Sequence, residues 1–214
     1  MTIPDARSVP GSIPGSRGAA PAPASPRVPA APVDPRFLDR WSPRAFSPEP
    51  IDDATLATLF EAARWAPSCS NEQPWFFLYG STPEDLEHFQ PLLEPGNREW
   101  ADRAPVLAVL FTRRAWKRTG KPNRWAQFDA GASWLALALQ ARALGLYAHA
   151  MGGFDEDLAY ELLQVPREDY EAMAVIAIGR YGDPSSLPPR QLAKEFPNGR
   201  KPPAEVAHRG RLSA

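Results

Sequence analysis

The chain has 214 residues, of which 24 are basic and 25 are acidic, so its formal net charge at pH 7 is −1. This balance gives no reason to expect a nucleic acid or an anionic membrane as partner, because both are bound through basic surfaces. The single cysteine, Cys69, excludes an internal disulfide and a cysteine-based zinc site, and the three histidines show no ligand spacing, so we expect no metal.

Residues 1–35 differ in composition from the rest of the chain. They hold nine of the 26 prolines but no aromatic residue and no leucine. Such a segment buries too little apolar surface to offset the entropy that is lost on ordering. We therefore predict a disordered Pro/Ala-rich tail over residues 1–35 and one folded domain over residues 36–214. The sequence shows no secretory signal and no apolar run of about 18 residues, so a cytoplasmic protein is expected.

The first half of the domain predicts two helices and two buried strands. Residues 51–68 carry apolar side chains at helical spacing behind an aspartate cap. Residues 74–80 and 104–112 are short apolar runs, which is typical of buried strands. Between them, residues 81–93 offer a Ser/Thr cap and a proline in the first turn, which predicts a second helix.

The second half contains a helix of unusual composition. Residues 128–145 are apolar nearly all round and end at Gly145, a typical stop. A helix without a polar face is buried on all sides, so we expect it to be central or covered by a second subunit. Strands are predicted over residues 146–151 and 172–182, with a short helix between them, and a Pro-rich basic arm closes the chain. This mixture of elements predicts an α+β fold.

Known catalytic motifs are missing. The sequence has no dinucleotide-binding glycine motif, no phosphate-binding P-loop, no nucleophile elbow and no zinc-protease motif. If the chain is an enzyme, a bound cofactor is therefore expected to supply the chemistry.

Two polar stretches are candidates for holding such a cofactor. Arg40, Ser42 and Arg44 alternate, so in an extended segment they share one face, where two guanidinium groups and a hydroxyl suit a phosphate. A solvated turn is the alternative. Residues 66–75 form a loop rich in small polar groups that could contact a polar heterocycle, with a capping and turn segment as the alternative.

Two further stretches allow the same pair of interpretations. Gly152 and Gly153 follow a strand and would let the backbone approach a flat ligand closely, or they form an ordinary turn. Arg200 and Lys201 in the terminal arm could add positive charge to an anion site, or they belong to an exposed basic tail.

In this order, the stretches resemble the nitroreductase family of FMN-dependent oxidoreductases. The resemblance spans residues 36–206, and its most specific parts are R-x-S-x-R and A-P-S-x-x-N-x-Q-P-W. It rests on "RWSPRAF", "LFEAARWAPSCSNEQPWFF", "GNREWADRAPVLAV", "ALALQARALGLYAHAMGGFD", "AVIAIGRYGDP" and "GRKPPAEV". It implies a nitroreductase-like α+β fold, with a mixed or antiparallel central sheet flanked by helices, in an intertwined homodimer with FMN at the interface.

The resemblance also implies roles for individual residues. The FMN phosphate and ribityl chain would be held by an arginine-rich cup: Arg40, the Trp41 backbone, Ser42, Arg44, Arg200 and Lys201. Pro67, Ser68 and Asn71 of the other subunit would contact the flavin ring. The ring would also contact the side chain of Asn97 and the backbone of Gly152 and Gly153. A backbone N–H of the glycine pair would reach flavin N5, and no side-chain acid or base is assigned.

The implied reaction is hydride transfer from NADH or NADPH, through flavin N5, to nitroaromatic, quinone or similar acceptors in a ping-pong cycle. The basic, aromatic segment 110–128 is expected to shape substrate access or to be a surface loop. The alternatives are a flavin-binding protein without turnover, or the same fold used for reductive dehalogenation or flavin-consuming benzimidazole synthesis.

Overall fold

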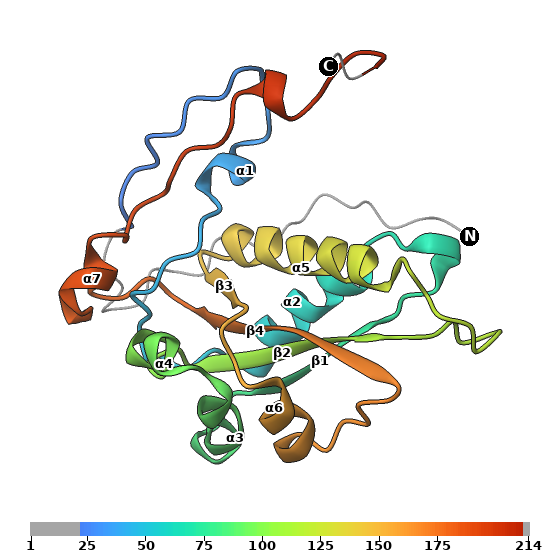
Figure 1. Cartoon of the computed structure of the whole chain (residues 1–214). Coiled ribbons are helices and arrows are strands. Elements are labelled where there is room, and N and C mark those ends of the chain that lie inside the picture. Colours follow the sequence, from blue (N-terminus) through green and yellow to red (C-terminus); the bar gives the residue numbers. More distant parts are fainter. Residues whose placement is uncertain (1–21, 212–214) are drawn as a thin grey trace, which may run out of the picture.

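The computed structural model describes residues 22–211 and shows a four-stranded sheet with helices on both faces (Figure 1). The strands are β1 (Trp75–Gly80), β2 (Val106–Arg113), β3 (Tyr147–Met151) and β4 (Tyr170–Gly179). The helices are α1 (Pro35–Asp39), α2 (Asp53–Arg64), α3 (Pro83–Phe89), α4 (Pro95–Ala101), α5 (Ala126–Ala143), α6 (Glu156–Leu162) and α7 (Pro189–Leu192). The predicted α+β class is confirmed.

The described strands pair in the order β1-β2-β4-β3, and every neighbouring pair is antiparallel. Alternate residues of β2 enter two separate cores: Val106, Ala108 and Leu110 face one, and Leu107, Val109 and Phe111 face the other. This period of two follows from the pleat of a strand, and a strand that is apolar at every position is buried on both faces. The apolar run at residues 104–112, which predicted a buried strand, therefore contributes side chains to both cores.

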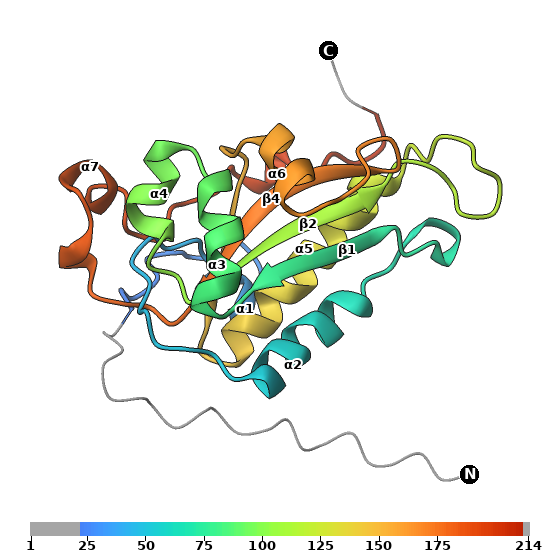
Figure 2. The same cartoon turned by 90° about the horizontal axis from the view of Figure 1, so that it is seen from below.

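The two cores are closed by different helices. α2 and α5 cover one face of the sheet, and α3, α4 and α6 cover the other, as the two views show together (Figures 1 and 2). α2 begins behind Asp52, whose side chain accepts the backbone N–H of Thr55, so the predicted aspartate cap is present. No helix within residues 22–211 is long and apolar enough to cross a membrane.

The prediction that the apolar helix is buried on all sides is wrong for the single chain. α5 packs Leu137 and Ala141 against the sheet, but Phe128 is 75% exposed and Leu135 is 43% exposed. Gly145 has a φ of 75° just after the helix, which agrees with its expected role as a stop. Of the two expected arrangements, the structure of one chain excludes the central helix and leaves an apolar face free.

The two ends of the described chain run together. Residues 22–34 are extended beside the C-terminal arm, and the two segments lead away from the sheet side by side (Figure 1). Residues 1–21 of the predicted tail lie outside the described residues, so its disorder remains a prediction. α4 and the short α1 and α7 are helices that the sequence analysis did not predict.

Candidate functional site

The segment that follows α1 is held along the sheet by alternating residues. Trp41, Pro43 and Ala45 are buried, and the next residue, Phe46, is buried and forms a β-bridge with Tyr181. Ser42 and Arg44, which alternate with them, remain half-buried. The expected extended segment with one polar face is therefore present, and its apolar face anchors it to the core.

A buried carboxylate fixes the backbone of this segment. Glu195, which comes just after α7, accepts the N–H of Arg44 at 3.0 and 2.9 Å and that of Ala45 at 2.9 Å. Burial raises the pKa of Glu195, while these N–H groups and the charge of Arg44 act in the opposite direction. The sequence analysis missed Glu195, because "LAKEFP" contains no signal that the glutamate is buried.

The guanidinium groups of Arg27, Arg40 and Arg200 lie close together at the start of this segment. Burial lowers the pKa of Arg40, and the nearby charges of Arg200 and Arg27 lower it further. Within residues 22–211, no carboxylate lies within ion-pair distance of any of these three side chains. Two half-buried cations, Arg27 and Arg40, beside the exposed Arg200 and without a nearby carboxylate among these residues fit an anionic ligand such as the phosphate of FMN.

The remaining members of the expected cup lie nearby, with one exception. The guanidinium carbon of Arg44 lies 5.9 Å from the centre of the Trp100 ring, and its charge acts on His149, whose ring also contacts Trp100. Lys201 instead points to Glu205 at 3.7 Å and is exposed. The structure thus brings Arg200, and not Lys201, to the arginine segment.

His149 lies beneath the arginines as a neutral side chain. Its Nδ1 lies 2.7 Å from the Pro43 carbonyl oxygen, which can only accept, so Nδ1 carries the proton. Burial lowers the pKa of His149 to about 4, and the charges of Arg44 and Arg40 add to this effect. The hydrogen bond to Pro43 thus satisfies the ring nitrogen that carries the proton.

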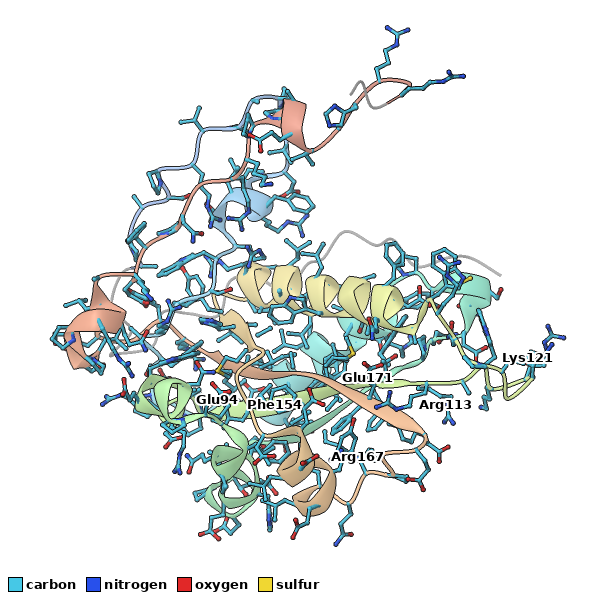
Figure 3. The ribbon with its side chains drawn as sticks, viewed as in Figure 1. Glu94, Arg113, Lys121, Phe154, Arg167 and Glu171 are labelled. Carbon is cyan, nitrogen blue, oxygen red and sulfur yellow. The ribbon has the colours of Figure 1, made fainter. Side chains whose placement is uncertain are left out.

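The two glycines after β3 have different surroundings. The Gly153 carbonyl accepts the Asn97 side-chain amide at 2.8 Å and the Glu94 N–H at 3.2 Å. A Cβ on Gly153 would lie 2.8 Å from both the Asn97 amide and the Glu94 carboxylate, whereas a Cβ on Gly152 would meet nothing within 4 Å. Gly153 therefore packs against α4, and only Gly152 is open to a ligand. Glu94 and Phe154 mark this place in Figure 3.

The polar loop before β1 has a strained backbone. Ser70, Asn71 and Gln73 have φ angles of 53°, 57° and 50°, in the left-handed region that costs L-residues energy and is frequent at functional sites. The Ser68 hydroxyl accepts the Gln73 N–H at 3.0 Å and so holds the loop closed.

A second buried carboxylate supports this loop. Asp129 in the first turn of α5 is 2% exposed and accepts the Cys69 N–H at 3.1 Å. Burial raises the pKa of Asp129, and the Cys69 N–H acts in the opposite direction. Beside it lies a cavity of about 280 Å³ that is lined by the loop and by α5: Pro67, Ser68, Cys69, Trp125, Phe128 and Asp129.

The loop and the arginine segment lie at opposite ends of the molecule. The loop leads into Trp75, which aligns through Thr112 with Glu171 on β4, whereas His149 aligns with Ala177. Six residues of strand separate these positions, which is about 20 Å. Figure 1 shows the loop beyond one end of α5 and α1 above the other end. A single chain does not bring Pro67, Ser68 and Asn71 to the arginines.

Comparisons with known proteins agree on one family. The nitroreductase family model matches residues 38–94 and 84–180. A Streptomyces coelicolor protein, provisionally named NADH dehydrogenase/NAD(P)H nitroreductase, is 33% identical over 184 residues, which are 76% of this chain and 89% of that protein.

Two solved structures extend this result. One is described as an oxidoreductase containing FMN; it is 43% identical with a TM-score of 0.84, over 90% of this chain and 98% of its own. Another, from Exiguobacterium sibiricum, is described as a nitroreductase in complex with FMN. It is 19% identical with a TM-score of 0.67, over 81% of this chain and 95% of its own, and shows the fold alone.

Proposed function

The chain belongs to the nitroreductase family, and from this premise we propose that it is an FMN-dependent oxidoreductase that uses NADH or NADPH as reductant. The observation that carries the proposal is the group of cations at Arg40, Arg200 and Arg27, which have no carboxylate within ion-pair distance among residues 22–211. The FMN of the 43% identical solved structure supports the same cofactor here. The chemistry that bound FMN would supply is hydride transfer from the nicotinamide to an acceptor.

The residues of one chain would hold two parts of FMN. Arg40, Ser42, Arg44 and Arg200 would bind the phosphate and the ribityl chain, since charged forks and a hydroxyl recognise such groups. Lys201 would add long-range positive charge only. The Trp41 side chain is buried against Tyr147 and Tyr181, so its backbone alone is available to a ligand.

The flavin ring would lie against the turn after β3. Gly152 leaves space for a flat ring, while Asn97 and Glu94 fix the orientation of the following peptide through the Gly153 carbonyl. Asn97 would therefore act on the flavin through this peptide as well as by direct contact. His149 is neutral at pH 7 and bonded to Pro43, so it supplies no proton, which agrees with a reaction that needs no side-chain acid.

We infer that two copies of the chain complete the site. Pro67, Ser68 and Asn71 lie about 20 Å of strand away from the arginines within one chain, so a partner must bring its own loop to them. The exposed face of α5 offers the contact surface, with Phe128, Gly131 and Leu135 at helical spacing.

The proposed dimer is tested by placing a charged side chain on the exposed face of α5. Leu135→Glu should convert a dimeric mass in light scattering to a monomeric one and should weaken FMN binding, because each site then lacks the partner's loop. Leu192→Glu on α7, where the leucine is similarly exposed at 45%, is the matched control and should remain dimeric. A monomeric wild-type chain at micromolar concentration would contradict the shared site.

The phosphate cup is tested with two ligands that differ by the phosphate. Arg44→Ala should weaken FMN binding by roughly tenfold or more and leave riboflavin binding unchanged, since one charge-assisted contact is removed. Arg167→Ala removes an equal charge from an exposed ion pair with Asp157 in another part of the molecule and should change neither affinity. Equal losses for both ligands in Arg44→Ala would contradict a phosphate contact.

The reaction is tested with the FMN-loaded protein under anaerobic conditions. We expect NADH or NADPH to bleach the flavin absorbance, and a nitroaromatic or quinone to restore it. Parallel double-reciprocal plots would support the ping-pong cycle. Absence of bleaching with both nicotinamides would contradict the proposal and leave a flavin-binding protein without turnover. Loss of flavin absorbance without recovery under oxygen would indicate flavin-consuming benzimidazole synthesis, and halide release from a halogenated acceptor would indicate dehalogenation.

A further inference from the structure

Arg27 of the N-terminal segment ties together three parts of the chain. Its Nε donates to the Asn198 carbonyl at 2.7 Å, and its Nη1 donates to the carbonyls of Leu38 at 3.0 Å and Arg40 at 2.6 Å. The Ser25 hydroxyl donates to the same Leu38 carbonyl at 3.2 Å. The guanidinium group therefore lies between the start of the arginine segment and the C-terminal arm.

Among residues 22–211, part of this guanidinium group has no hydrogen-bond partner. Nη2 of Arg27 is buried and accounts for two of the five N–H donors, yet no acceptor for it exists among the described residues. A buried donor without a partner is costly, and the cost is higher for a charged group. The backbone oxygens around Nε and Nη1 explain how the side chain is held, but they do not explain the free donors.

The charges around Arg27 make the same point independently. Burial lowers the pKa of Arg27, and the nearby charge of Arg200 lowers it further. The Arg40 guanidinium responds to both Arg27 and Arg200, so the three groups repel one another. No carboxylate within residues 22–211 lies close enough to pair with any of them. An anion at the centre would satisfy the free donors and offset the repulsion.

We propose that Arg27 donates from Nη2 to the FMN phosphate, beside Arg40 and Arg200, and that residues 22–34 are thereby part of the cofactor site. This inference rests on the proposed function, because it assumes that FMN is the anion. It gives the N-terminal segment a binding role that its composition does not indicate. A purely mechanical role, in which Arg27 only ties its segment to the arm, is the competing explanation.

The two explanations differ in which ligand they affect. Arg27→Gln should weaken FMN binding by roughly tenfold or more, as expected for loss of a charge-assisted hydrogen bond, and riboflavin binding by less than about twofold. Arg36→Gln is the matched control, because it removes the same charge from α1, where the exposed Arg36 pairs with Asp34; it should change neither affinity. Both ligands are titrated by flavin fluorescence with the full-length chain, and the melting temperature of each variant is recorded.

Two results would overturn the proposal: FMN affinity unchanged in Arg27→Gln, or equal weakening of FMN and riboflavin. If Arg27→Gln does not fold, Arg27→Lys is the second variant, because it keeps the charge but changes the donor. The phosphorus resonance of FMN bound to Arg27→Lys should shift relative to the wild type, and an unshifted resonance would also overturn the proposal. If Arg27→Gln gives one of these results while Arg44→Ala still weakens FMN binding and not riboflavin binding, only the inference about Arg27 is overturned. A wild-type chain that binds no FMN removes the proposed function as well.

Discussion

Lowering the pH should destabilise this protein through His149. The imidazole lies beside the Pro43 carbonyl, with its ring centre 4.5 Å from that of Trp100 and with the charges of Arg40 and Arg44 nearby, and no carboxylate among residues 22–211 shifts its pKa. Its pKa is about 4 in the folded protein against 6.5 as the ordinary value. The unfolded chain therefore binds a proton at a pH where the folded chain does not.

The sign and the size follow from linkage. A folded-state pKa below the unfolded one gives a stability that is fully present above pH 6.5 and is lost as the pH falls towards about 4. Each unit of difference between the folded and unfolded pKa corresponds to about 1.4 kcal/mol, so His149 contributes roughly 3 kcal/mol to the free energy of unfolding at high pH. Roughly 2 kcal/mol of this is lost between pH 7 and pH 4.5. A loss of this size is a large part of the stability of an ordinary domain.

Urea unfolding of FMN-free protein, followed by tryptophan fluorescence at pH 7 and pH 4.5, measures this loss. His149→Phe keeps a ring against Trp100 but cannot titrate, so the difference in unfolding free energy between wild type and variant should shift by roughly 2 kcal/mol against the wild type between the two pH values. His88→Phe, at an exposed position on α3, should show no such shift. If the difference for His149→Phe is the same at both pH values, burial does not exclude the imidazolium form and the reasoning is wrong.

Two further predictions concern the backbone that carries the arginines. Gly182→Ala should lower the unfolding free energy by about 1–3 kcal/mol, because the new Cβ would lie 2.6 Å from the Phe46 backbone; Gly199→Ala meets no atom within 4 Å and should be nearly neutral in the same urea experiment. Glu195→Ala should cost about 1–3 kcal/mol, since buried N–H groups at Arg44 and the next residue lose their acceptor. Unchanged urea midpoints for Gly182→Ala or Glu195→Ala would show that the segment is held by other contacts.

The helices and strands could be predicted because their signals are local. The cap at Asp52, the stop at Gly145 and the apolar run that became β2 each depend on a few neighbouring residues. α4 was not predicted because, unlike α3 and α6 of the same length, it has no side-chain cap at its start, although Pro95 in its first turn was a usable signal. Its Asn97 was noticed only through the family resemblance.

The arrangement of the site depends on contacts between distant residues. The sequence showed that Arg40, Ser42 and Arg44 alternate, and this is enough to place them on one face of an extended segment. It did not show that Glu195 holds that segment, that Arg200 rather than Lys201 approaches it, or that Arg27 joins them. These pairs lie 13 to 171 residues apart along the chain.

The sequence by itself thus determined the four strands, the helices α2, α3, α5 and α6, the α+β class and the family to which the residues point, because periodicity, caps and motifs are encoded over short stretches. Only the tertiary structure decided which cations meet, that the apolar helix keeps a free face, and that the polar loop lies at the far end of the sheet from the arginines. The physical reason is that packing selects one register and one set of long-range contacts, and a buried carboxylate or an unpaired guanidinium acquires its properties only from the neighbours that packing gives it.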